Sequence, residues 1–410
     1  MDAGQTAGVS LRLSRATLDD TAIVSLASSH PALSAAGDTA AALGLARELG
    51  RSIGSSGHVE TAALWETLAT IAATDVECAR VVEPHLDALA ILAEASAGGI
   101  RVNLAEVNAS EHSTWGVFAA ESSGMRLEAA AGAAAAAGAA GAADTGAETG
   151  ADAGTVAGTD TGANTLFVML SGTKPWCSLA SRLSHALVTA HTPMGRALFA
   201  VDLRSPRITT HDQLWISRGM SGVPSGPVDF DRVRAVRVGG VGWYLDRPGF
   251  SRGGLGVAAI WWGGAIGIAR AMLEHAASRE PDAFALAHLG AVDVAIEATR
   301  ASLCSAAERL DAHSIGMPLL SGGPHNQHGQ QVLTDADGRL LAARGRAVAA
   351  RCAETALDRS ARSLGPGPFA SDERFARRHA DLAMYVRQHH ADRDDAAIGR
   401  MITAQVKPPW

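Results

Sequence analysis

The stretch "SGTKPWCSLA", residues 171–180, places an aromatic side chain and a hydroxyl two positions apart, at Trp176 and Ser178. Residues i and i+2 of a β-strand point to the same face. On a strand, Trp176 and Ser178 would therefore offer a flat wall and a hydrogen-bond donor to one planar molecule with a polar edge. The alternative is that Trp176 is an ordinary core residue and Ser178 a turn residue.

A second group of reactive side chains lies in "RQHHADRDD" near the C-terminus, where His389, His390 and Asp392 fall within one helical turn. Histidine changes its charge near neutral pH, so it suits the transfer of a proton to or from a substrate. These three residues are candidates for a general base. The alternative is a solvated helix face with charged and polar side chains paired four residues apart.

The composition excludes several classes of partner. The net charge is −7, with acidic and basic residues interspersed, which argues against nucleic acid because phosphate binding needs a basic face.

His325 and His328 share a loop without a carboxylate partner, so we expect no metal site. Four widely spaced cysteines form no Cys-x-x-Cys pair, which favours reduced thiols in a cytoplasmic protein.

Two features bear on membranes. The N-terminal residues "MDAGQTAGVSLRLSR" contain no apolar core of a signal peptide. The longest uncharged apolar stretch, residues 253–269, is shorter than the roughly 20 residues that a membrane span needs. We therefore predict a buried helix there and no membrane span.

The pattern along the chain predicts three regions. Residues 1–112 show helical spacing of apolar side chains from about residue 15. Residues 113–245 contain short runs bounded by Gly, Pro, Ser and Asp, typical of a small β-barrel or sandwich. Residues 246–410 predict a four-helix bundle, with helices at about 253–279, 283–313, 338–364 and 371–402.

Between the first two predicted strands lies a low-complexity segment, residues 129–164, rich in Ala, Gly and Thr. It has too little apolar surface to offset the entropy of ordering it. We interpret it as a flexible insertion at the tip of a β-hairpin without a catalytic role.

Three strings resemble motifs of the acyl-CoA dehydrogenase superfamily of flavoproteins. "SGTKPWCSLA" resembles L-N-G-x-K-x-W-I-[TS]-N-A. "GMSGVPSGPVDFDRVRAV" resembles G-x-R-G-[ST]-x-[ST]-x-x-V-x-F-x-x-V-x-V, and "WGVFAAESSG" resembles F-x-x-T-E-P-x-x-G-S-D. The resemblance spans residues 15 to 402 apart from the insertion. It implies an N-terminal helical domain, a middle β-barrel domain and a C-terminal four-helix bundle, with FAD held between them.

The resemblance also implies roles for individual residues. Trp176 would pack on the flavin ring, and Ser178 would bond near its N5/O4 edge. The backbone of Phe118, Ala119 and Ala120 would border the ring edge, although Ala120 replaces the Thr that usually contacts the flavin.

The resemblance places the cofactor phosphates further along the chain. Arg279, Gly365 and Gly367 would border the pyrophosphate, often across a subunit interface, although Ala361 stands where the family has Gln. Arg359 and Arg362 are alternative sources of positive charge. For Arg279 the alternative is a cation that stabilises the C-terminus of a helix.

The catalytic Glu of the superfamily is missing. The two positions at which it occurs are Arg387 and Val257 in this chain. An Arg stays protonated and cannot act as the base. Either the base has moved to His389, His390 or Asp392, or the flavin chemistry differs, or the protein is catalytically silent.

From the resemblance we expect an FAD-dependent oxidoreductase that acts on the CH–CH group of an acyl thioester or related substrate. A flavin-dependent monooxygenase of the same fold and a catalytically silent accessory protein are the alternatives. The expected partners are a small acyl substrate, possibly a CoA thioester, and an electron acceptor, either electron-transfer flavoprotein or O2. Members of the superfamily are usually homodimers or homotetramers, so we expect the same here.

Overall fold

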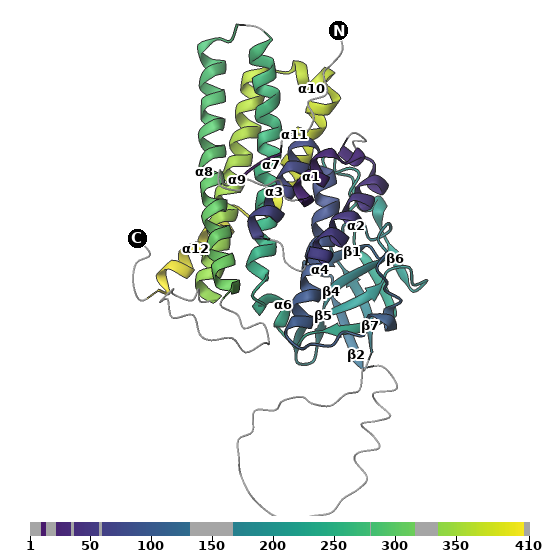
Figure 1. Ribbon diagram of the computed structural model, residues 1–410. Helices are drawn as coiled ribbons and strands as arrows, with labels where there is room; N and C mark the ends of the chain where they lie inside the picture. The colour runs from purple at the N-terminus through teal and green to yellow at the C-terminus, as the bar shows by residue number, and fades with distance from the viewer. Residues whose placement is uncertain are drawn as a thin grey trace, which may run out of the picture. The chain divides into compact units, whose positions relative to one another are not determined.

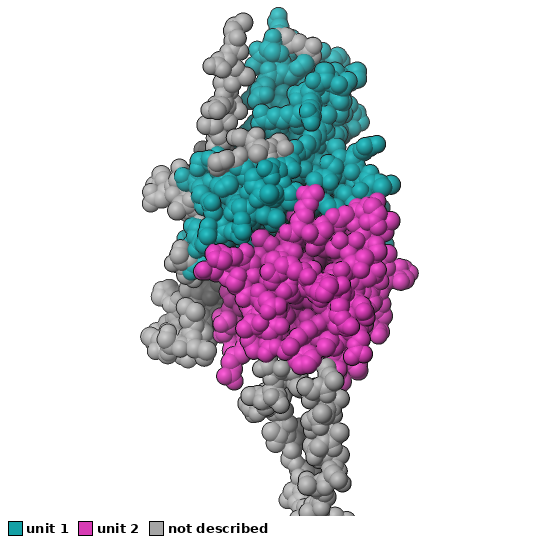
Figure 2. Space-filling view, turned by 90° about the vertical axis from the view of Figure 1, so that its right-hand side faces the viewer, with its two compact units in different colours: residues 1–91, 215–224, 245–410 teal, residues 92–214, 225–244 magenta. Residues whose placement is uncertain are grey.

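The computed structural model describes residues 10–13, 22–33, 37–56, 60–131, 167–278, 280–315 and 335–405. They belong to two compact units, coloured separately in Figure 2. Unit 1 comprises residues 1–91, 215–224 and 245–410, and unit 2 comprises residues 92–214 and 225–244.

Unit 2 is built on β-strands. They are β1 (Trp115–Phe118), β2 (Leu127–Ala131), β3 (Val168–Lys174), β4 (His185–Thr192), β5 (Gly195–Asp202), β6 (Ile208–Thr210) and β7 (Val228–Val238). Two short 3-10 helices, η2 (Leu104–Val107) and η3 (Asp212–Leu214), accompany them.

The strands close into a small barrel. Strand β4 pairs with β2, β2 with β3, β3 with β7, β7 with β5, and β5 returns to β4, which closes the ring. Strand β1 runs parallel to the first half of β4, and β6 pairs with β7. Apolar side chains on both faces of β4 and β5, such as Leu187 on one face and Phe199 and Val201 on the other, are fully buried. Closure removes the exposed edges that an open sheet would leave, and the prediction of a small barrel is confirmed.

Strands β2 and β3 are antiparallel, with Ala131 opposite Val168. They flank the low-complexity segment, whose residues 132–166 lie outside the described part of the chain. Strand β2 was not predicted, because "LEAAA" lacks the β-branched and aromatic residues that mark strands. The strand takes in Ala129, Ala130 and Ala131, which we had assigned to the insertion.

Unit 1 is helical. Its helices are α1 (Ala22–Ser29), η1 (Pro31–Leu33), α2 (Thr39–Ser56), α3 (Thr61–Thr74), α4 (Val76–Ala97, whose end falls in unit 2), α7 (Phe250–Ala277), α8 (Ala283–Ile315), α9 (Asp335–Leu364), α10 (Gly367–Ser371), α11 (Glu373–Tyr385), η4 (Val386–Gln388) and α12 (Asp392–Thr403). Helix α6 (Trp243–Asp246) lies at the boundary between the units.

Helices α7, α8 and α9 run side by side (Figure 1), and α7 also packs against α3. The approach of α7 to α3 is so close that a Cβ on Gly263 would lie 2.2 Å from the carbonyl oxygen of Ala69. Among the described residues, α7 is the one helix whose length and mean hydropathy of 1.4 would allow it to cross a membrane. Most of its apolar window is buried inside the protein, as the sequence predicted.

One helical prediction needs correction. The helix predicted at 371–402 is broken, because α11 ends at Tyr385 and α12 starts at Asp392, with Ala391 between them at a φ of 46°. Helix α4 runs without a break through Pro84. Proline usually costs an interior helix a hydrogen bond; here the packing of α4 offsets that cost.

Candidate functional site

The end of β3 and the chain just after β1 are joined by an ion pair. Nζ of Lys174 donates to Oε1 of Glu121 at 2.7 Å and to Oγ1 of Thr189 at 3.0 Å. The Lys174 side chain is 1% exposed, so its charge needs this partner. Burial lowers the pKa of Lys174, and the bond to Glu121 opposes that shift.

Glu121 is the centre of a small charged group. His191 lies 3.2 Å and Arg196 3.5 Å from its carboxylate, in addition to Lys174. Burial alone would raise the pKa of Glu121, but the hydrogen bonds from Lys174 and His191 lower it. The carboxylate is therefore ionised near neutral pH and ties together two of the three strings that resemble flavoprotein motifs.

Lys174 and Glu121 both lie in strings that resemble flavoprotein motifs, but we predicted no role for either. The available signal was that Lys174 is one of only two lysines in the chain, next to Pro175 and Trp176. A lone lysine at the end of an apolar strand needs a carboxylate partner, and that partner lies one residue after Ala120.

Trp176 is held in an unusual conformation. Its backbone φ is 58°, which residues other than Gly and Asn rarely adopt, and the residue is 55% exposed. Such backbone strain costs on the order of 1–3 kcal/mol and tends to occur at functional positions. The strain is therefore offset by other contacts of the folded protein, although the Trp176 side chain is not buried in the core. This exposure argues against the alternative that Trp176 is an ordinary core residue.

Our placement of Trp176 and Ser178 on one strand was wrong. Strand β3 ends at Lys174, and Ser178 lies in a turn. The turn is held by the segment before β7, since Cys177 N–H donates to the carbonyl of Gly226 at 3.0 Å and the Ser178 and Ser225 hydroxyls lie 2.8 Å apart. The ring and the hydroxyl are thus positioned by a rigid turn rather than by strand alternation.

The residues at the end of β1 differ in exposure. Phe118 ends the strand and is 2% exposed, Ala119 is half-buried and Ala120 is exposed. Only Ala119 and Ala120 therefore offer backbone to a ligand at the surface of unit 2. Phe118 contributes to the core.

In unit 1 the three candidate bases differ in their exposure to solvent. His390 and Asp392 are exposed, whereas the side chain of His389 is only 9% exposed. The His389 ring lies edge-on to Trp261 with their centroids 6.3 Å apart. Burial lowers the pKa of His389, Asp394 opposes this and Arg346 adds to it. His389 is therefore neutral at pH 7 and able to accept a proton.

The two positions that usually carry the superfamily's Glu hold no base here. Arg387 is exposed and bonds to Glu354 at 2.7 Å. Val257 is half-buried in α7.

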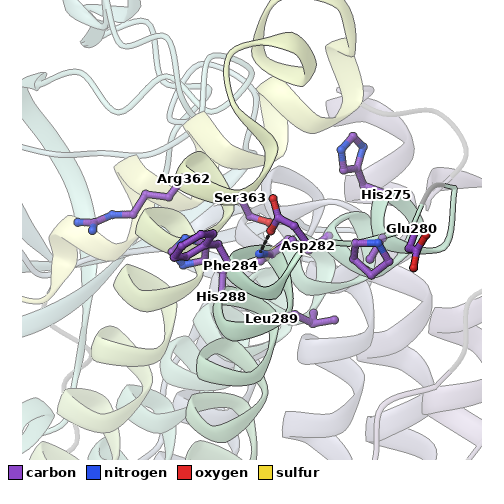
Figure 3. Close-up of a pocket in the computed structure, with 12 residues that line it drawn as sticks. His275, Glu280, Asp282, Phe284, His288, Leu289, Arg362 and Ser363 are labelled. Atoms are coloured by element: carbon purple, nitrogen blue, oxygen red, sulfur yellow. Dashed lines mark hydrogen bonds between the residues drawn. The ribbon is translucent and has the colours of Figure 1, made fainter.

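A pocket of about 330 Å³ lies in unit 1, and Arg362, an alternative source of positive charge for the phosphates, lines it. Arg279 lies outside the described residues, but its neighbours Glu280 and Asp282 line the pocket with Arg362 and Ser363. Figure 3 shows Arg362 projecting from α9 on the side opposite Glu280. Arg362 already bonds to Asp358 at 2.9 Å.

The two glycines have local reasons for their positions. Gly365 follows the last residue of α9 with a φ of 65°, the left-handed conformation that commonly ends a helix. Gly367 begins the short helix α10. Neither lines the pocket. The pocket's described lining carries the carboxylates of Glu280 and Asp282 together with Arg362 and two histidines.

The chain resembles several solved structures of flavin enzymes. KijD3 in complex with FMN and dTDP-3-amino-2,3,6-trideoxy-4-keto-3-methyl-D-glucose matches with a TM-score of 0.68 and 15% identity, over 94% of this chain and 92% of that one. The chain has an acyl-CoA dehydrogenase-like fold. FMN-bound TdsC from Paenibacillus sp. A11-2 matches with a TM-score of 0.63 and 17% identity, over 89% and 92% of the two chains.

Methanesulfinate monooxygenase MsuC from Pseudomonas fluorescens matches with a TM-score of 0.62 and 18% identity, over 89% of this chain and 90% of that one. No family model matches the sequence, and no curated protein does. At these identities the likeness shows the fold, and the chemistry has to be argued from the residues.

Proposed function

We propose that the chain is a flavin-dependent oxidoreductase and, within that class, a monooxygenase. The proposal depends on three features that occur together. The chain has this fold, His389 is neutral and largely buried, and the two positions expected to carry a glutamate hold Arg387 and Val257. Solved structures of this fold include monooxygenases. CH–CH dehydrogenation needs a positioned base for the α-proton, and the two positions where the resemblance places a glutamate hold Arg387 and Val257 instead.

The surface of unit 2 fits a flavin ring. Trp176 presents an exposed aromatic face in a strained turn, and Ser178 places a hydroxyl two residues away. Ala119 and Ala120 directly precede Glu121 in the chain. The ion pair with Lys174 holds Glu121 in place and so positions the backbone of the two alanines. A reduced flavin bound here would supply the electrons for oxygen activation, and these residues would bind and orient it.

We propose FMN rather than the FAD expected from the sequence. Two of the similar solved structures, those of KijD3 and TdsC, contain FMN. Among the residues expected at the FAD diphosphate, Ala361 stands where the family has Gln. A homo-oligomer and a cytoplasmic location stay predictions.

The test separates oxygenation from dehydrogenation. The protein is loaded with FMN or FAD, and its visible spectrum is followed without oxygen during titration with acyl-CoA thioesters. We expect no bleaching by any thioester and, after chemical reduction of the flavin, rapid reoxidation by O2. Bleaching by a thioester would contradict the monooxygenase and restore the dehydrogenase, and a protein that binds neither flavin would support the silent accessory protein.

A further inference from the structure

Residues 215–224, which we call the strap, pack in unit 1. The chain on either side of them, up to Leu214 and from Ser225 onward, belongs to unit 2. Within unit 1 the strap lies so close to α11 that a Cβ on Gly219 would be 2.0 Å from the carbonyl oxygen of Ala380. The strap is therefore packed tightly against a helix of unit 1.

Two buried carboxylates hold the strap by its backbone. Oδ1 of Asp381 on α11 accepts a hydrogen bond from Met220 N–H at 2.6 Å. Oε1 of Glu77 on α4 accepts one from Gly222 N–H at 2.7 Å. Asp381 and Glu77 are 2% and 3% exposed. Because a buried backbone N–H needs an acceptor, these two carboxylates fix the strap in its place.

The carboxylates that hold the strap also repel each other. Three carboxylates contact the guanidinium group of Arg377 on α11, those of Asp75, Glu77 and Asp381, at 3.0, 2.9 and 3.5 Å. Glu77, Asp75 and Arg377 are the charged groups that face Asp381, and the strap presents the Met220 N–H to it. Burial and then Glu77 raise the pKa of Asp381 to about 7. A proton on Asp381 relieves the repulsion and leaves an oxygen that can still accept from Met220 N–H.

The strap leads directly to the groups that hold the turn around Trp176. The hydroxyl of Ser225, the residue after the strap, lies 2.8 Å from that of Ser178. The carbonyl of Gly226, the next residue, accepts a hydrogen bond from Cys177 N–H at 3.0 Å. A strap that moves therefore pulls on both bonds that hold the turn.

We propose that the strap is a proton-controlled latch, which holds the turn around Trp176 in place while Asp381 carries a proton and loosens it when Asp381 ionises. Asp381 and Glu77 are positioning residues, because they act on the turn through the strap. An effect of the latch on flavin affinity rests on the proposed function. The latch itself does not.

The direction of the pH effect follows from the pKa of Asp381. An open strap exposes Asp381 to water, where a carboxyl of this kind has a pKa of about 4. The closed strap raises that pKa to about 7, so it holds a proton that the open strap releases. Closing is therefore favoured at low pH, and the ratio of closed to open strap falls about tenfold between pH 6 and pH 8.

The experiment measures hydrogen exchange in the flavin-free full chain at pH 6 and pH 8. Mass spectrometry follows peptides from the strap and from residues 175–181, with the rates corrected for the intrinsic effect of pH. A hydrogen-bonded N–H exchanges when its bond opens. We expect the protection of both segments to fall about tenfold from pH 6 to pH 8.

Variants of Asp381 separate the latch from a merely structural role. Asp381→Asn keeps an acceptor for Met220 N–H but cannot ionise, so both segments should be as well protected at pH 8 as at pH 6. Asp381→Ala removes the acceptor and should speed exchange at both pH values. Asp372→Asn is the matched control, because Asp372 also accepts from a backbone N–H, that of Phe375, but is exposed. Its exchange should match that of the original chain.

Gly219→Ala opens the strap without changing a charge. The added Cβ cannot fit against the Ala380 carbonyl, so the strap and residues 175–181 should both lose protection at both pH values. Gly240→Ala is the control, because the space around Gly240 is open and the strap should keep its protection.

Three outcomes would overturn the proposal. They are equal protection of the strap at pH 6 and pH 8, a pH dependence that survives in Asp381→Asn, and a strap that opens in Gly219→Ala while residues 175–181 stay protected. Asp381→Asn is nearly isosteric, so its result decides the question even if Gly219→Ala fails to fold.

A second arm with added FMN tests the link to the proposed function. If the latch and the flavin act on the same turn, bound FMN should slow exchange in the strap, because coupling between two sites is reciprocal. FMN that does not bind would count against the proposed function alone. FMN that binds without slowing exchange in the strap would contradict the coupling.

Discussion

Nζ of Lys174 lies 2.7 Å from Oε1 of Glu121, and this ion pair fixes the end of β3 against the segment that follows β1. The pair is the physical link between Trp176 and the backbone of Ala119 and Ala120. It explains why a lysine with 1% of its side chain exposed precedes the strained turn.

Lys174→Met should therefore lower both stability and flavin affinity. Removing one partner of a fully buried pair costs about 3–5 kcal/mol. Glu121 is about one-third exposed and keeps His191 and Arg196, so we expect a smaller loss of about 1–3 kcal/mol. Urea unfolding and flavin titration measure the two effects. Arg126→Gln, which breaks the exposed pair with Glu128, is the control, and equal losses in the two variants would contradict this role.

Trp176→Gly should separate stability from binding. Glycine adopts a φ of 58° without strain, so the free energy of unfolding should stay unchanged or rise by about 1 kcal/mol. Flavin affinity should fall because the ring is lost. Leu179→Gly is the comparison: Leu179 also has a positive φ, at 60°, but is 2% exposed, so its loss should destabilise the protein. A strongly destabilised Trp176→Gly protein would show that the ring serves the fold.

Asp381 should make unit 1 less stable as the pH rises. It lies beside Glu77, Asp75 and Arg377 and accepts a hydrogen bond from Met220 N–H at 2.6 Å. Burial and then Glu77 raise its pKa to about 7. The folded protein therefore holds a proton that the unfolded chain releases near pH 4, and stability falls between about pH 4 and pH 7.

Asp381→Asn should remove that part of the slope. The measurement is the free energy of unfolding from pH 5 to pH 8 in the two proteins. We expect the Asn variant to gain about 1–3 kcal/mol relative to the original chain over this range. Parallel curves would show that Asp381 is ionised in the folded state throughout.

His389→Asn should change the pH profile of flavin reoxidation. Because burial holds the pKa of His389 below its usual range, the original protein should show an inflection on the acidic side of neutrality, with the neutral ring active above it. The variant should lose the inflection and about 10²–10⁴ in rate, while flavin affinity is kept. His390→Asn, at the exposed neighbouring position, should match the original chain. If His390→Asn alone removed the inflection, His389 would be the wrong residue.

Much of the fold could be predicted because apolar periodicity reports burial. The runs around Leu187 and Phe199 predicted strands, and the uncharged stretch around Gly263 predicted a buried helix. Strand β2 was missed because alanine has no preference for strands. Its alanines become part of the sheet only through their pairing with β3.

The site was harder to predict because it depends on contacts that are distant in sequence. Lys174 and Glu121 are 53 residues apart, and Arg80 meets Tyr385 from a different helix. The break after Tyr385, which separates buried His389 from exposed His390, has no local signal such as Pro or Gly.

The most direct test of the central claim is a titration of the flavin-free protein with FMN and with FAD, followed by flavin fluorescence. We predict saturable binding of FMN, tighter than that of FAD, and weaker binding in Trp176→Gly. No binding of either flavin, or binding that Trp176→Gly leaves unchanged, would contradict a flavin site built on the Trp176 turn.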